Sequence, residues 1–215
     1  MKIAILGGTG KEGMGLGYRW AKAGHQITIG SRQETKAIEA AEKLQEMFDG
    51  KIKIDGKENL MAANEAELLV LTVPFSAHKT MCEYIKDVSQ GKIVIDVTVP
   101  LVPPKVTKVQ MPEAGSATLE AKMILGENTS VVAAFQNISY EHLIEDGEVA
   151  CDVLVTGDSK ASREIVIKLV QDAGLVGLDA GPIENSVVVE GLTSILIGIN
   201  KQYGIHDAGI KITGI

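Results

Sequence analysis

The sequence predicts an α/β protein with a doubly wound, mostly parallel sheet and a small C-terminal helical domain. Short apolar runs alternate with segments of helical periodicity, which is typical of a parallel sheet covered on both faces. A glycine-rich turn follows the first apolar run. Hydrophobic residues make up 45% of the 215 residues and aromatic residues only 4%, which suits a core of aliphatic side chains.

The expected elements follow from these patterns. Strands are expected at residues 3–6, 26–30, 68–72, 92–96, 130–135, 152–156 and 176–179, with a weaker strand near 52–54. Helices are expected at residues 11–24, 33–48, 58–64, 77–87, 113–125, 160–173 and 184–203.

The last helical segment differs from the others in length and pattern. It is expected to carry one apolar face, made of Val188, Leu192, Ile195 and Ile199. Gly191 and Gly198 on the same helix would let another backbone approach closely. We therefore expect residues 1–181 to form the sheet domain. Residues 182–215 are expected to form a small C-terminal domain that packs on the sheet, on a partner subunit, or on both.

Gly8, Gly10 and Gly13 have the G-x-G-x-x-G spacing of a dinucleotide-binding turn, between the first strand and the first helix. Gly8 allows the tight turn, Gly10 lets the backbone approach a pyrophosphate, and Gly13 lets the helix pack on the strand. The helix N-terminus would then bind the pyrophosphate. The alternative is that the glycines only form a tight loop, but their place between strand and helix favours a Rossmann nucleotide site.

The end of the second strand distinguishes NAD from NADP. An NAD site would carry a carboxylate there, to bind the ribose 2′-hydroxyl. This sequence instead has Ser31 and Arg32, with Lys36 shortly after, so a hydroxyl and two cations are available for a 2′-phosphate. The pattern predicts NADP(H), although the two cations could also belong to a solvated helix start.

Two further strands end alike, in Thr72, Val73 and Pro74 and in residues 98–100, which include Val99. Ligands of open parallel sheets bind outside the carboxyl ends of the strands, so these residues are expected to form walls of the cofactor site. The alternative is that they are ordinary strand exits. A polar exit at Gln136 and Asn137 follows the strand at 130–135 and could face a second substrate.

Other classes of site are not expected. The net charge of −7 argues against a nucleic-acid partner. We expect no membrane span and a cytoplasmic protein, because no apolar run is long enough and Met1 leads directly into a strand. Cys82 and Cys151 lack a CxxC partner and the histidines lack ligand spacing, so neither a disulfide nor a metal site is expected. No residue pattern indicates a catalytic acid, base or nucleophile.

Over its whole length the sequence resembles the F-420-dependent NADP reductases. The matching segments are residues 6–10 with Gly13, then 30–32, 71–74, 96–101, 132–137, 179–182 and 208–211. The resemblance implies reversible hydride transfer between NADP(H) and the deazaflavin coenzyme F-420. It also implies a homo-oligomer, either a homodimer or a homotetramer, with the deazaflavin between the two domains.

The resemblance also implies two groups of cofactor-binding residues. Those for NADP are Thr9, Gly10, Lys11, Glu12, Ser31, Arg32 and Lys36, with Pro74 and its neighbours along the path of the cofactor. Those bordering the deazaflavin are Ala134, Gln136, Asn137 and Ala208. Some members of the family carry His at the position of Gln136, so we assign Gln136 no role in proton transfer.

Two other functions remain open from the residues alone. One is an NADPH-dependent reductase of a small imine, ketone or metal chelate, whose N-terminal half would look the same. The other is a non-catalytic NADP sensor that controls association with a partner protein. Enzymes of the first kind usually need an acid or a much larger helical domain.

Overall fold

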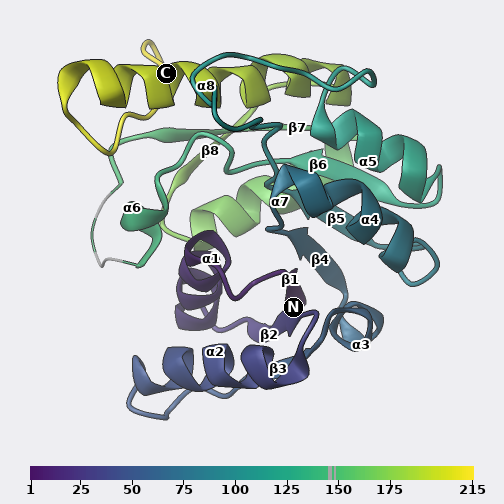
Figure 1. Ribbon diagram of the computed structural model, residues 1–215. Helices are drawn as coiled ribbons and strands as arrows, with labels where there is room; N and C mark the ends of the chain where they lie inside the picture. The colour runs from purple at the N-terminus through teal and green to yellow at the C-terminus, as the bar shows by residue number, and fades with distance from the viewer. Residues whose placement is uncertain (145–146, 148) are drawn as a thin grey trace.

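A single sheet organises the protein, with helices on both of its faces (Figure 1). The computed structural model describes residues 1–144, 147 and 149–215. Within these residues the sheet has eight strands, in the order β3-β2-β1-β4-β5-β6-β7-β8. The strands are β1 (Lys2–Leu6), β2 (Gln26–Ser31), β3 (Ile54–Glu58), β4 (Leu68–Leu71), β5 (Ile93–Asp96), β6 (Ser130–Ala133), β7 (Asp152–Gly157) and β8 (Val176–Asp179). Only β6 and β7 pair antiparallel, so the predicted mostly parallel, doubly wound sheet is confirmed.

The helices cover the sheet in two layers. They are α1 (Lys11–Lys22), α2 (Glu34–Glu46), α3 (Asn59–Glu65), α4 (Phe75–Ile85), α5 (Ala117–Leu125), α6 (Tyr140–Ile144), α7 (Lys160–Asp172) and α8 (Ser186–Tyr203), with a short 3₁₀ turn η1 (Ile183–Asn185) before α8. Alternate residues of β1 point to opposite faces: Ile3 and Ile5 join a core with α1, α2 and α7, whereas Ala4 and Leu6 join a core with α3, α4 and α5. Both faces are therefore buried, as the continuous apolar strands predict.

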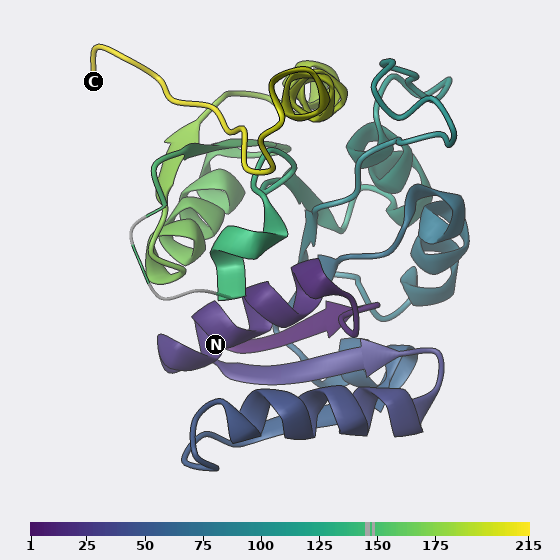
Figure 2. The same ribbon diagram turned by 60° about the vertical axis from the view of Figure 1, so that its left-hand side comes forward.

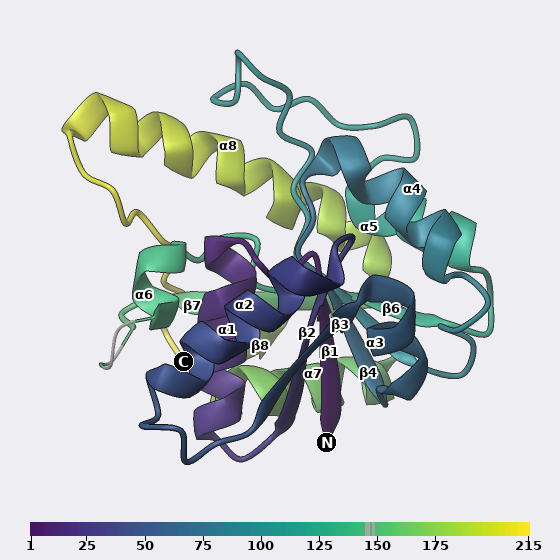
Figure 3. The same cartoon turned by 60° about the horizontal axis from the view of Figure 1, so that its bottom comes forward.

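The strand order places a crevice at the centre of the sheet. From β1 the chain moves outward to β2 and β3, then returns to the other side of β1 with β4. The reversal leaves a gap between the connections at the carboxyl ends of β1 and β4, where open α/β sheets bind ligands. In Figure 3 β1 runs upward from the N-terminus, and α8 lies beyond the upper ends of the strands.

Several predicted boundaries were wrong. The weak strand expected near 52–54 is β3, which runs over Ile54–Glu58; its polar residues carry no apolar signal because β3 is an edge strand. The helix expected from 113 begins at Ala117, where the Ser116 side chain accepts a hydrogen bond from the N–H of Leu119. The strand expected to reach 135 ends at Ala133, and α6 was not expected at all.

The apolar face predicted for α8 points partly outward, which is one of the arrangements left open for the C-terminal segment. Val188 and Ile195 of the expected apolar face are 63% and 50% exposed, while Ser186, Glu190 and Ser194 point inward. The inward side combines these polar residues with the buried apolar residues Val189 and Leu196. Glu190 accepts hydrogen bonds there from the backbone N–H groups of residues 117 and 118 at the start of α5. The two glycines of α8 face side chains of the loop before α5 rather than another backbone. Figure 2 shows α8 almost end-on between this loop and the C-terminal segment.

A membrane span is not among the described elements: none of their helices combines the length and the apolar character that crossing a bilayer requires.

Candidate functional site

A large cavity lies at the carboxyl ends of β1, β2, β4, β5 and β6. Its volume is about 1310 Å³, and residues of the glycine turn, α2, α4, α6, α8 and the C-terminal segment also line it. A typical site for one small ligand has a volume of ~300–1,000 Å³. The cavity therefore has room for more than a single small molecule.

The glycine turn forms the floor at one end of the cavity. A Cβ on Gly8 would lie 2.6 Å from the carbonyl oxygen of Ile5, and a Cβ on Gly13 would lie 2.5 Å from the Cα of Gly8. These two glycines therefore permit tight backbone packing, and neither lines the cavity. A Cβ on Gly10 would meet nothing within 4 Å, and Gly10 caps α1 without a side-chain hydrogen bond. The N–H groups that begin α1 thus face an open space suited to an anion.

Glu12 lies in the first turn of α1 and lines this end of the cavity. Its Oε1 atom is buried and has no hydrogen-bond partner among the described residues. Burial raises the pKa of Glu12 to about 8. The neutral acid therefore predominates at neutral pH, which removes a negative charge from a place suited to a pyrophosphate.

Ser31, Arg32 and Lys36 meet at the rim beyond β2 and all line the cavity. Ser31 is 8% exposed, and its Oγ accepts a hydrogen bond from the N–H of Gln33. Arg32 and Lys36 are exposed, and neither has a carboxylate partner within the described part of the chain. Two uncompensated cations beside a hydroxyl form a suitable site for a phosphate group.

The ends of β4 and β5 form the middle wall. Thr72, Val73, Pro74 and Val99 all line the cavity. The Thr72 hydroxyl donates to the carbonyl of Leu6 at 3.1 Å, which joins the end of β4 to the end of β1. Thr72 is therefore anchored to the backbone of the neighbouring strand, and the wall beside it is largely apolar.

Gln136 and Asn137 form the far wall, and each is 5% exposed. Gln136 donates from Nε2 to the carbonyl of Asp96 at 2.6 Å, and Asn137 donates from Nδ2 to the carbonyl of Val189 at 2.9 Å. These bonds fix the amide orientations and leave Gln136 Oε1 and Asn137 Oδ1 without partners among the described residues. Both oxygens are acceptors, so this wall suits a ligand with N–H donors.

Phe135 explains how these two amides reach the cavity. Its φ is +73°, a left-handed conformation that is uncommon for a bulky residue and costs ~1–3 kcal/mol. The buried ring packs edge-on against Trp20, with 5.6 Å between ring centroids. The tertiary packing holds this turn, and the chain then enters the cavity wall at Gln136.

A buried ion pair lies directly behind the ends of β4 and β5. His78 Nε2 is 2.7 Å from Asp96 Oδ2, and both side chains are fully buried. Burial opposes the charge on His78, but the Asp96 carboxylate outweighs it and the pKa of His78 is raised to about 11. Asp96 Oδ1 also accepts from the N–H of Thr98, a cavity residue. The pair therefore fixes the backbone at the end of β5.

The C-terminal segment closes one side of the cavity. Ala208 lines it and donates its N–H to Asn200 of α8 at 3.0 Å. Further along, Lys211 Nζ lies 2.8 Å from Asp152, whose carboxylate also accepts from the N–H of Ile212. Asp152 is 1% exposed and so anchors the segment at the start of β7.

Most residues predicted for the site line this one cavity: Thr9, Gly10, Glu12, Ser31, Arg32, Lys36, Thr72, Val73, Pro74, Val99, Gln136, Asn137 and Ala208. Four others do not: Gly8, Lys11, Gly13 and Ala134. Lys11 turns toward α6, where its Nζ lies 3.0 Å from the Tyr140 hydroxyl and 4.5 Å from the ring centroid. Ala134 is fully buried behind the wall.

Sequence reasoning missed several residues of the site. Asn59, Thr193 and Asn200 line the cavity, and His78 with Asp96 supports it. Asp96 belongs to the matching segment 96–101, but that segment gives no hint of its ion pair with His78. The other residues belong to none of the motifs, and contacts across the sheet bring all of them to the site.

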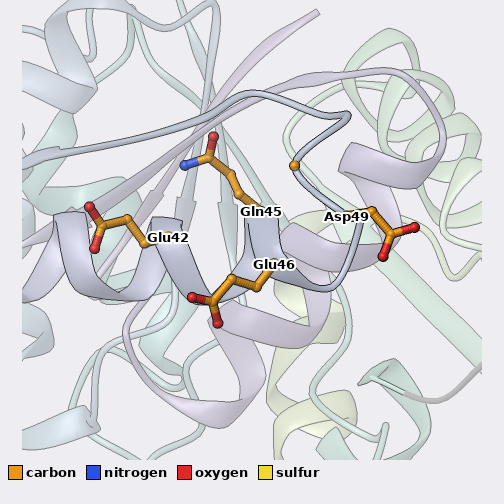
Figure 4. A pocket seen from close by; sticks show the side chains of 5 residues that line it. Glu42, Gln45, Glu46 and Asp49 are labelled. Carbon is orange, nitrogen blue, oxygen red and sulfur yellow. The ribbon is translucent and has the colours of Figure 1, made fainter.

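A second, smaller hollow lies at the end of α2 and is lined by Glu42, Gln45, Glu46, Asp49 and Gly50. Figure 4 shows its side chains pointing in different directions rather than converging. Its carboxylates would repel a phosphorylated ligand, so it does not compete with the large cavity as a nucleotide site.

The strand order, the central crevice and the glycine turn before α1 define a dinucleotide-binding protein of the Rossmann type. Residues 2–100 match the family described as NADP oxidoreductase, coenzyme F420-dependent. The chain belongs to the family of F420-dependent NADP reductases. It is 38% identical to the F420-dependent NADP reductase of Methanothermobacter marburgensis, over 100% of this chain and 99% of that protein. It is 39% identical to that of Methanocaldococcus jannaschii, with the same coverage.

Solved structures share the fold at lower identity. A crystal structure of a protein from Arthrobacter sp. FB24 covers 100% of both chains with a TM-score of 0.83 and 22% identity. A pyrroline-5-carboxylate reductase from Coxiella burnetii matches with a TM-score of 0.60 and 16% identity, over 95% of this chain and 72% of that one. The overall fold is therefore shared with these two proteins.

Proposed function

We propose that this protein transfers a hydride reversibly between NADP(H) and the deazaflavin coenzyme F-420. The observation that carries the proposal is the identity of 38% and 39% to two F420-dependent NADP reductases over the full length of the chain. The cavity agrees with this function, because its volume of about 1310 Å³ is large enough for two cofactors side by side.

The residues of the cavity divide into two ends with different chemistry. At the first end, the start of α1 receives the pyrophosphate, and Ser31, Arg32 and Lys36 bind the 2′-phosphate of NADP. At the other end, the side-chain oxygens of Gln136 and Asn137 accept hydrogen bonds from N–H groups of the bound rings. The NADP and deazaflavin halves of the site are thus distinguished by charge and by hydrogen-bond polarity.

The chain contributes positioning and exclusion of water rather than acid or base catalysis. When bound, the two cofactors supply the hydride donor and its acceptor. The ends of β4 and β5 hold Thr72 and Val99 along the middle wall, and the far wall fixes the two amides. Fixed walls of this kind would position the two bound rings and limit the access of water. We assign no catalytic residue.

The test is to mix the purified protein with NADPH and coenzyme F-420 and to follow the visible absorbance of the deazaflavin. Loss of this absorbance is expected. In the reverse assay, which starts from reduced coenzyme F-420 and excess NADP⁺, the absorbance should appear. Tight NADPH binding without any change in absorbance would contradict the proposal. It would instead favour a reductase of a small imine, ketone or metal chelate, or a non-catalytic NADP sensor.

We also infer a homo-oligomer, a homodimer or homotetramer, in the cytoplasm. The support is the outer face of α8, where Val187, Val188, Ile195 and Tyr203 are 37%, 63%, 50% and 69% exposed. Residues 182–215 would then form a C-terminal domain that both closes the deazaflavin pocket and meets a second copy. Light scattering would measure the assembly, and Val188→Lys should dissociate it. A monomeric wild-type protein would contradict this inference.

A further inference from the structure

Asn59 is a buried polar residue of the cavity that has been given no role so far. It is the first residue of α3, directly after β3, and its side chain is 1% exposed. It lines the cavity together with Gly7, Thr9, Gly10, Ser31 and Arg32. Asn59 therefore lies at the end of the cavity where the nucleotide phosphates are expected.

The orientation of the Asn59 amide is fixed by one hydrogen bond. The backbone N–H of Gly7 donates to Asn59 Oδ1 at 3.1 Å. A backbone N–H can only donate, so the oxygen must face Gly7 and the nitrogen must face the other way. The hydrogen bond from Gly7 therefore identifies Nδ2 as the end of the amide that faces away from Gly7.

Asn59 Nδ2 has no hydrogen-bond partner within the described residues. A buried donor without an acceptor is unfavourable, and proteins rarely retain one without a reason. The amide also needs a glycine beside it, because a Cβ at position 30 would lie 2.7 Å from Asn59 Oδ1. Gly30 therefore makes room for Asn59 just before Ser31 and Arg32.

We propose that Asn59 binds the adenosine half of NADP, by donating a hydrogen bond from Nδ2 to an oxygen of the ribose or of its 2′-phosphate. This inference rests on the proposed function, because it needs NADP in the cavity. The register of the sheet supports it: Ser31 pairs with Glu58, so Asn59 follows directly beside the residues that receive the 2′-phosphate. Both candidate groups on the ligand are acceptors, which is what the unpaired donor requires.

Asn59→Asp is the test variant, because it keeps an oxygen for Gly7 and replaces the donor by an acceptor that also carries a negative charge. The Kd values of NADPH, NADH and adenosine 2′,5′-bisphosphate are measured by calorimetry, with circular dichroism as a check on folding. NADPH and the bisphosphate should both bind about 10- to 150-fold more weakly. Asn64→Asp is the control: it introduces the same charge on the same helix at an exposed position, and it should change each Kd less than twofold.

The two cofactors distinguish the two acceptors. A loss confined to NADPH and the bisphosphate would assign the 2′-phosphate, whereas an equal loss for NADH would assign a ribose hydroxyl. Unchanged binding of all three ligands would overturn the inference and leave the proposed function intact, whereas failure of the wild-type protein to bind NADPH would contradict the proposed function itself.

A crystal structure of the wild-type protein with NADP⁺ is the second test, and it does not depend on how the variant folds. An adenosine or 2′-phosphate oxygen within hydrogen-bond distance of Asn59 Nδ2 is expected. A complex in which this nitrogen faces only protein atoms would overturn the inference.

Discussion

Replacing Arg32 by alanine tests the cofactor preference most directly. Arg32 is exposed at the rim of the cavity and has no carboxylate partner among the described residues, so its donors are free to bind a phosphate. A hydrogen bond to a charged group contributes ~1.5–3 kcal/mol, which corresponds to about a 10- to 150-fold increase in the Kd of NADPH. Because Lys36 lines the same rim, binding should weaken without being abolished.

The assay is calorimetric titration of the variant with NADPH and with NADH. The Kd of NADH should change little, because NADH lacks the 2′-phosphate. Lys43→Ala is the matched control, since Lys43 is an exposed cation in the last turn of α2, away from the cavity. An equal loss for NADPH and NADH would refute the assignment of Arg32 to the 2′-phosphate.

Three other predictions follow from single contacts. Gly10→Ala should leave the melting temperature almost unchanged but weaken the binding of NADPH at least tenfold, because the new Cβ points into the open space of the site. Gly13→Ala should instead lower the melting temperature, because its Cβ would collide with the backbone of Gly8. The reverse pattern would contradict the roles of the two glycines. The pKa of Glu12 in the folded protein is about 8, above its usual value of 4.5, so the free energy of unfolding should fall as the pH rises from about 4.5 to 8. Chemical denaturation should show a smaller fall for Glu12→Gln, which cannot ionise. Asp152→Asn should loosen the C-terminal segment, raising the KM for coenzyme F-420 with little change for NADPH and speeding tryptic cleavage after Lys211; unchanged cleavage would argue against this anchor.

The Asp152 anchor should also depend on pH. Its hydrogen bonds from Lys211 and from the N–H of Ile212 lower the pKa of Asp152 below its usual value. A lowered folded pKa means that the anchor contributes stability above the unfolded pKa and loses it as the pH falls through the folded value. Cleavage of the segment is therefore expected to become faster only under acidic conditions.

The neighbouring reductases clarify what the scaffold does and does not decide. Pyrroline-5-carboxylate and imine reductases share the sheet at 16% and 15% identity in two solved structures. A shared sheet therefore does not by itself decide the substrate, which depends on the side chains of the site. In this protein the far wall carries two anchored amides, Gln136 and Asn137, whose acceptor oxygens have no partner among the described residues.

The sequence by itself determined the sheet, the glycine turn and the cationic rim. The local signals are the apolar strands, the spacing of Gly8, Gly10 and Gly13, and the lack of a carboxylate at the end of β2 itself; each is contained within a few residues. Local conformational preferences and burial on both faces are enough to specify such features. For the same reason β3 was misplaced: a polar edge strand lacks the periodicity that identifies the others.

Only the tertiary structure decided which way α8 turns and which buried polar groups serve the site. The apolar pattern of α8 left open whether its apolar face meets the sheet or a partner subunit. Glu190 faces inward because the start of α5, far away in the sequence, offers it backbone donors. Asn59 meets Gly7, and His78 meets Asp96, through contacts that the sheet creates. The value of a buried polar group depends on the partner it finds in space, and no local pattern in the chain encodes that partner.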